Sequence, residues 1–96
     1  MHVLALEVEL RLPLAESLKD KRRVVLSLTE ATRRRFEVSA AEVAAVDDHR
    51  RAVLGFAAVG ASPDHLSSVI DRVEDFVWSN QSAEVVDARR LWLDDA

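Results

Sequence analysis

The residues with the clearest chemical potential form a basic cluster where a helix should begin. The run Ser17-Leu-Lys-Asp-Lys-Arg-Arg places a serine three residues before an acid, directly ahead of an apolar-periodic stretch, as at a helix N-terminus. That end of a helix carries partial positive charge and favours acids, and its free backbone amides bind anions. Four cations nevertheless crowd it: Lys19, Lys21, Arg22 and Arg23. The run therefore predicts an anion-binding site.

Lys21 admits two interpretations, because it falls in the middle of the apolar arc of this helix, beside Val25. In the first, its aliphatic stem covers apolar surface while its ammonium reaches past the sheet end to a carboxylate. The carboxylates proposed as its partner are Glu7, Glu9 and Glu84. In the second, Lys21 joins Arg22 and the helix amides around a phosphate or carboxylate. Both stay open, although runs of charge are usually solvated or internally paired.

Charge is unevenly spread along the 96 residues, whose net charge is −4. Residues 17–36 hold seven cations against two acids, whereas residues 62–96 hold three cations against eight acids. The overall acidic field does not attract nucleic acid, so DNA is not expected and any RNA contact must be local to the first helix. The candidate anion or RNA contacts are Ser17, Lys19, Lys21, Arg22, Arg23, Arg33 and Arg34.

Other chemistries lack their residue patterns. The neighbouring Asp47, Asp48 and His49 supply acid and base types, but turn residues without motif context are usually just solvated. The three histidines show no metal-ligand spacing, and the only two glycines, Gly55 and Gly60, make no phosphate-binding loop. We therefore expect a protein that is not an enzyme and has no catalytic residue, metal or cofactor.

The periodicity predicts six elements. His2–Leu12 alternates as a strand until Pro13, and a helix then runs from Leu18 to Phe36. The later elements are strands at 38–46, 52–59 and 84–93 and a helix from the Ser62-Pro63-Asp64 start to about Trp78. Right-handed crossovers in this order give an α+β ferredoxin-like βαββαβ sandwich with the first and third strands central. Two helices then cover one face of a four-stranded antiparallel sheet, and residues 1–96 form one domain.

The third and fourth strands are apolar on both faces, although the helices can cover only one face of the sheet. An uncovered apolar face predicts association, most simply as a homodimer or larger oligomer. The interface candidates are Leu54, Phe56, Ala58, Val86 and Trp92. Stacking of RNA bases on this sheet is not expected, because the third strand has a single aromatic residue and the first strand has none.

Two global features predict the compartment. The chain has no cysteine, as expected in a reducing cytoplasm, and it starts without a basic, apolar leader pattern. Its longest uncharged run is far too short to span a bilayer. We therefore expect a cytoplasmic protein without a membrane partner.

Two segments carry a resemblance to a known family: Ser17 to Arg22 after an alternating strand, and Arg51-Ala-Val-Leu-Gly-Phe opening the third strand. On these the chain resembles, nearly end to end from Val3 to Trp92, the small bacterial proteins of the YlxP-like family, also called domain of unknown function 503. The resemblance implies a ferredoxin-like fold. It also implies an association with RNA, since members tend to be encoded near a translation initiation factor and a ribosome-binding factor. No activity is established for the family, so no catalytic residue carries over.

Two functional hypotheses follow. In the first, the protein is a binding module for RNA or a ribosomal particle, which it contacts through the cations of the first helix. In the second, it is a homo-oligomeric module that binds a small anionic ligand at the start of that helix. Salt separates the two, because several phosphate contacts give a steep loss of affinity with salt and one small anion gives a shallow loss.

Overall fold

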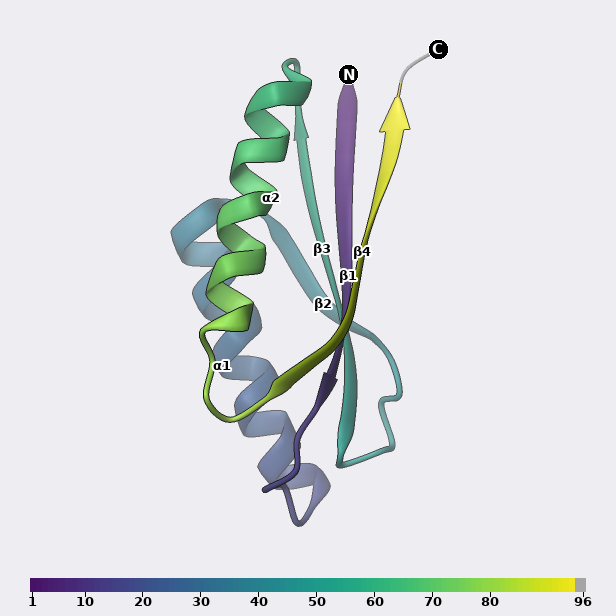
Figure 1. The fold of residues 1–96 in the computed structure, drawn as a ribbon, viewed down its shortest axis with the longest axis vertical. Helices are drawn as coiled ribbons and strands as arrows, with labels where there is room; N and C mark the ends of the chain where they lie inside the picture. Colours follow the sequence, from purple (N-terminus) through teal and green to yellow (C-terminus); the bar gives the residue numbers. More distant parts are fainter. Residues whose placement is uncertain (95–96) are drawn as a thin grey trace.

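Strands and helices alternate as the periodicity predicts. The computed structural model describes residues 1–94 and has the order β-α-β-β-α-β, which confirms the ferredoxin-like fold (Figure 1). Its elements are β1 (His2–Arg11), α1 (Leu18–Phe36), β2 (Ser39–Ala44), β3 (Arg51–Gly60), α2 (Pro63–Trp78) and β4 (Glu84–Asp94). The largest difference from expectation is β2, which is shorter at both ends. Its C-terminal end is set by an irregularity in the pairing between Glu42 and Ala44 and by a left-handed backbone at Ala45 (φ 57°).

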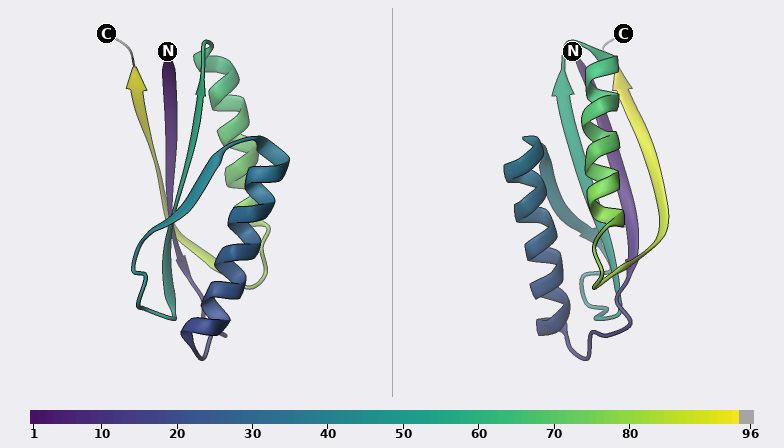
Figure 2. Two further views of the ribbon diagram at one scale, coloured as in Figure 1. Left: turned by 180° about the vertical axis from the view of Figure 1, so that it is seen from behind. Right: turned by 60° about the vertical axis from the view of Figure 1, so that its left-hand side comes forward.

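The four strands form one antiparallel sheet in the order β2-β3-β1-β4. The first and third strands are therefore central, as predicted. Both helices lie on the same side of this sheet, and the β2–β3 turn projects from the opposite side (Figure 2). We call the side without helices the open face.

The hydrophobic core lies on the helix-covered face of the sheet. The pairing of β3 with β1 shows which β3 residues belong to it. Leu4, Leu6 and Val8 are buried in this core and lie opposite Ala58, Phe56 and Leu54 of β3. Directly opposed residues of an antiparallel pair point to the same face. Leu54, Phe56 and Ala58 consequently pack under the helices, and their assignment to the uncovered face is wrong.

Neither of the two interface candidates on β4 is paired with an open-face residue of β1, although both are exposed. Trp92 lies opposite Leu4 and so belongs to the helix side, where it is exposed because α2 packs mainly over β1 and β3. Val86 sits at an irregularity of the β1–β4 ladder, where β4 contributes one extra residue between Val85 and Asp87. The open face is instead formed by the opposite residues of each strand.

Both helices begin with the predicted serine caps. The Ser62 side chain accepts a hydrogen bond from the His65 amide, and Pro63 follows it at the start of α2. Helix α1 ends at Phe36 and is capped by Glu37, which has a left-handed backbone (φ 54°) and whose amide donates to the Arg33 carbonyl. In the described part of the chain, neither helix combines the length and the apolar character that crossing a bilayer requires.

Candidate functional site

The start of α1 satisfies its own polar groups to a large extent. Ser17 Oγ accepts a hydrogen bond from the Asp20 amide (3.1 Å), and Asp20 Oδ2 accepts one from the Glu16 amide (2.9 Å). This is a capping box whose return bond reaches the residue before the cap. The carboxylate of Asp20 thus already supplies the negative charge that a helix N-terminus favours. The predicted cap at Ser17 is confirmed, and its oxygen is engaged by the chain itself.

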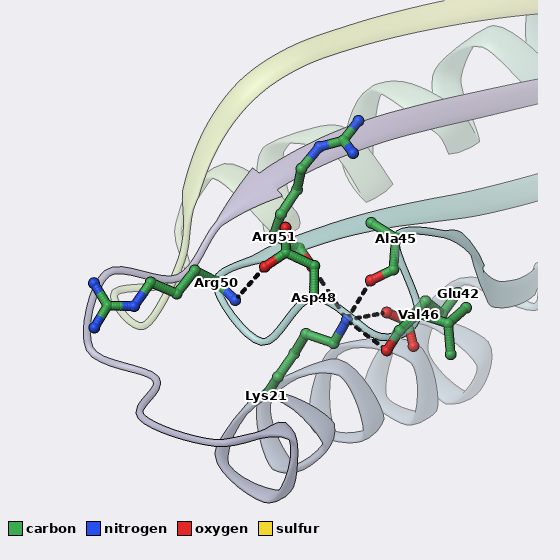
Figure 3. Close-up of polar contacts among 7 residues, drawn as sticks. All are labelled: Lys21, Glu42, Ala45, Val46, Asp48, Arg50 and Arg51. Carbon is green, nitrogen blue, oxygen red and sulfur yellow. Dashed lines mark hydrogen bonds and ion pairs between the residues drawn. The ribbon is translucent and has the colours of Figure 1, made fainter.

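Lys21 is fully buried and points into the molecule (Figure 3). Its ammonium donates hydrogen bonds to the carbonyl oxygens of Ala45 (2.7 Å), Val46 (3.1 Å) and Arg51 (3.1 Å). It also lies 2.8 Å from Glu42 Oε2 in an ion pair. A buried cation is tolerated only with such partners, because leaving it unpaired would carry the full desolvation penalty.

Lys21 is paired within the chain with a carboxylate, as the first interpretation expects, but with a different residue, and the second interpretation is wrong. Its ammonium does not stand beside Arg22 at the helix start, where an anion would bind. Its carboxylate partner is Glu42 rather than the predicted set of Glu7, Glu9 and Glu84. The β2–β3 turn explains the difference: after β2, residues 45 and 46 direct their carbonyls toward α1, and Asp48 Oδ1 braces the turn by accepting from the Arg50 amide (3.0 Å).

The outer face of α1 presents the remaining cations of the cluster to solvent. Lys19, Arg22, Arg23 and Arg34 are exposed, and among the residues that the structure describes none of them has a hydrogen-bond or ion-pair partner. Lys19 and Arg23 are one helical turn apart, so their side chains project in nearly the same direction. We call these four residues the outer cations.

Two further arginines of the last turn of α1 are held by the chain. Arg33 donates from Nε (3.2 Å) and Nη2 (2.8 Å) to the Ala40 carbonyl, which ties the end of the helix to β2. The Arg35 guanidinium carbon lies 4.8 Å from the ring centroid of Phe76 on α2, a cation–π contact. Cations in the last turn also stabilise the helix dipole. Arg33, a predicted contact residue, therefore already has a structural role, but its side chain remains exposed.

A groove between α1 and β2 brings two predicted residues together. It measures about 360 Å³, and Arg22 and Arg33 line it with the exposed Leu26 and with Ala41 and Glu42 of β2. A flat base, a ring or an apolar side chain with a nearby anionic group would fit its mixture of lining residues. The sequence contains no signal for this groove, because it depends on where β2 docks beside α1.

Three arginines of the sheet are paired with acids. On the open face Arg89 contacts Glu7 (2.6 Å) and Arg51 contacts Glu9 (2.7 Å). The hydrogen bond from Arg51 holds the pKa of Glu9 below its usual range, and the same bond raises the pKa of Arg51. These pairs leave little free positive charge on the sheet.

Arg90 makes a similar connection on the helix side. It bridges β4 to α2 through Asp71 (2.8 Å) and Glu74 (3.1 Å). Partial burial acts to lower the pKa of Arg90, but the hydrogen bonds to Asp71 and Glu74 outweigh it and raise that pKa. Within residues 1–94, no three acidic or histidine side chains gather as they would around a metal ion.

A comparison with models of protein families gives a match. The model of the family described as "Protein of unknown function (DUF503)" matches residues 3–90, which is nearly the whole chain. A comparison with curated proteins finds none that matches.

Proposed function

The chain belongs to the DUF503 family, and we propose that it is a non-catalytic, cytoplasmic module that binds RNA or a ribosomal particle through the outer face of α1. The observation that carries this proposal is the gathering of four exposed cations, unpaired within residues 1–94, on one face of α1. The outer cations have no partner among the described residues, whereas Arg51, Arg89 and Arg90 are each paired with acids. Unpaired cations on one helix face are available to neutralise phosphates.

The spacing of these cations suits a polyanion better than a single small anion. Lys19, Arg22 and Arg23 occupy little more than one turn, and Arg34 follows about 16 Å farther along the helix axis. One phosphate cannot reach both ends of that row, but an RNA backbone can. Arg33, which is held beside Arg22 over the groove, adds a positioned donor.

The mode of contact follows from the overall charge and from the sheet. A chain with net charge −4 has no general attraction to nucleic acid, so binding depends on local contacts to the backbone. The central strand β3 has one aromatic residue, Phe56, and it is buried under the helices, where no base can stack on it. We therefore propose recognition of RNA shape and phosphates rather than of base sequence.

The test is binding to fluorescein-labelled ribosomal RNA fragments over a range of salt concentrations. Four phosphate contacts predict a loss of affinity of about a hundredfold between about 50 mM and about 200 mM salt. The double variant Lys19→Glu with Arg23→Glu should remove binding and leave the fold intact. The control is Arg11→Glu with Arg50→Glu, which makes the same change in net charge at exposed positions outside α1.

Two results would contradict this function. If the α1 variant binds like the unmodified protein, the outer cations are not the contact surface. If the unmodified protein shows no affinity, or only a shallow salt dependence, the alternative of a module for a small anion takes its place. That alternative has lost one of its expected ligands, because the Lys21 ammonium is engaged by Glu42 and backbone carbonyls.

A further inference from the structure

The open face of the sheet changes from apolar to charged residues halfway along β1 and β4. In β1 the residues on this face are Val3 and Ala5, followed by Glu7 and Glu9. Val59 and Ala57 of β3 lie opposite the first two, and on the other side so do Leu93 and Leu91 of β4. These six residues form what we call the apolar patch: Val3, Ala5, Ala57, Val59, Leu91 and Leu93. β1 and β4 become charged at the same level of the sheet, while β3 between β1 and β2 continues with Gly55 and Val53.

Nothing in the described part of the chain covers the apolar patch. Val59 and Leu93 are each 65 % exposed and Leu91 is 53 % exposed, because both helices lie on the other side of the sheet (Figure 2). At the other end of the open face, beside Glu7 and Glu9, the apolar residue Val53 is buried near the β2–β3 turn. An antiparallel sheet that turns one face to water normally carries polar residues there. The patch departs from that rule over half of the face only.

The patch contains a hollow as well as projecting side chains. A groove of about 390 Å³ lies along it, lined by small residues that include Ala5, Ala41, Gly55 and Ala57. Position 55 in this groove needs a glycine, because the Cβ of any other residue would lie only 2.9 Å from Val43 Cγ1. Leucine and valine side chains stand beside the hollow on the same surface. A two-fold contact between identical chains needs both features on one patch, since each copy must supply the projection and the recess.

Charge also favours a second copy. The apolar patch contains no charged residue, so two patches can meet without repulsion. The ion pairs that border it, Glu7–Arg89 (2.6 Å) and Glu9–Arg51 (2.7 Å), are satisfied within the chain. The apolar patch itself consequently offers no charge that would select an RNA or a strongly charged protein.

We propose that a second copy of this chain covers the open face, forming a two-fold dimer in which Leu91 and its neighbours enter the groove of the partner copy. From strand spacing and length, the whole open face has a flat area of about 600 Å², without the added surface of its side chains. This area approaches the roughly 800 Å² per partner of a standard interface. The apolar patch forms the centre of the contact and the ion pairs form its polar rim. Both α1 helices point away from the contact, so the proposal is independent of RNA binding.

Sedimentation velocity of the full chain between about 1 and 100 µM tests this proposal, because that range detects dimers with micromolar dissociation constants. The unmodified protein should sediment as a dimer of twice the 10.7 kDa chain mass at the higher concentrations. Leu91→Glu places a charge in the patch and should weaken self-association about a hundredfold. The matched control is Leu26→Glu on α1, where the leucine is 55 % exposed and the dimer should persist.

A second variant keeps the test decisive if Leu91→Glu does not fold, as judged by circular dichroism. Ala41→Glu changes an exposed residue on the wall of the groove and should also give a monomer. A monomeric unmodified protein at 100 µM would overturn the proposal. So would a dimer that survives in folded Leu91→Glu and Ala41→Glu variants, or one that the control substitution disrupts, because the contact would then lie elsewhere.

Discussion

The inner and outer faces of helix α1 use the same basic residue types in opposite ways. Lys21 on the inner face has three carbonyl oxygens and one carboxylate oxygen around its ammonium, and water does not reach it. Lys19, two residues earlier on the outer face, is exposed and has no partner among the described residues. A compact run of cations in the sequence thus divides into a structural element and a surface.

This difference shows why a charge run should be divided by helix face before it is interpreted. A buried cation and its partners depend on one another, because removal of either leaves a buried polar group unpaired. Removing the cation is therefore expected to lower the free energy of unfolding strongly. Exposed cations that repel one another contribute little to stability, and their role is to contact a binding partner. The predictions below test this division, beginning with the largest expected effect.

Substitution of Lys21 should destabilise the protein strongly. Lys21→Met keeps the aliphatic stem but leaves the Glu42 carboxylate and three carbonyls without their donor. We expect the free energy of unfolding in urea to fall by about 3–5 kcal/mol, whereas Lys19→Met should change it by less than about 0.5 kcal/mol. Equal effects of the two substitutions would show that the inner and outer faces do not differ. The double variant Lys21→Met with Glu42→Leu should recover part of the loss, because no carboxylate remains unpaired.

The helix cap should matter less than the buried lysine. Ser17→Ala removes the acceptor of the Asp20 amide and should cost about 1 kcal/mol of unfolding free energy. Ser27→Ala, at an exposed position inside α1, is the control and should be neutral or slightly stabilising, since alanine favours helix. If Ser17 also bound a functional anion, its substitution would change the salt dependence of RNA binding. We expect that dependence to stay as it is in the unmodified protein.

Neutralising the outer cations should leave stability nearly unchanged. In the double variant Lys19→Gln with Arg23→Gln, two like charges one turn apart are removed, so the free energy of unfolding should stay within about 0.5 kcal/mol or rise. Thermal melts at low and high sodium chloride check the reason. Salt screens repulsion in the unmodified protein, and the gain in melting temperature on adding salt should be smaller in the variant. A clear loss of stability would mean that these cations are structural as well.

The smallest effect concerns a paired charge on the open face. The hydrogen bond from Arg51 lowers the pKa of Glu9 below its ordinary value of 4.5 in the folded protein. A lowered folded pKa means that the stabilisation is complete above the unfolded value and is lost as the pH falls through the folded value. The difference in melting temperature between the unmodified protein and Glu9→Gln should therefore be constant near neutral pH and shrink below pH 4.5. A constant difference at all pH values would show that the ion pair does not act through this titration.

The order of elements was predictable because its signals are local. Alternation in β1, the serine caps of both helices and the apolar period of α1 and α2 each lie within a few residues, and the structure places these elements where they indicate. The direction of Leu54, Phe56 and Ala58 was not predictable in the same way. A strand that is apolar throughout has no alternation to show which face is buried, so only its pairing with β1 settles the question. The open-face pattern of Val3 and Ala5 in β1 was the available clue.

The environment of Lys21 was only half visible in the sequence. Its position in the apolar arc signals a buried stem, but the oxygens around its ammonium belong to residues 21 to 30 positions later. Three of them are backbone carbonyls, which any residue type can provide, so no side-chain pattern identifies them. Glu42 was equally hidden, because the bend after β2 brings it to α1.

The Lys21 contacts have a consequence for how the molecule can open. The β2–β3 turn and the first turns of α1 share one ammonium, so neither can fray alone without exposing Glu42 or leaving carbonyls dehydrated and unpaired. Edge strands such as β2 are usually among the first parts of a sheet to exchange their amide hydrogens with solvent. Here the hairpin is joined to a helix that starts more than twenty residues earlier. Local opening at this edge is thereby coupled to the unwinding of α1, and the two segments form one cooperative unit of unfolding.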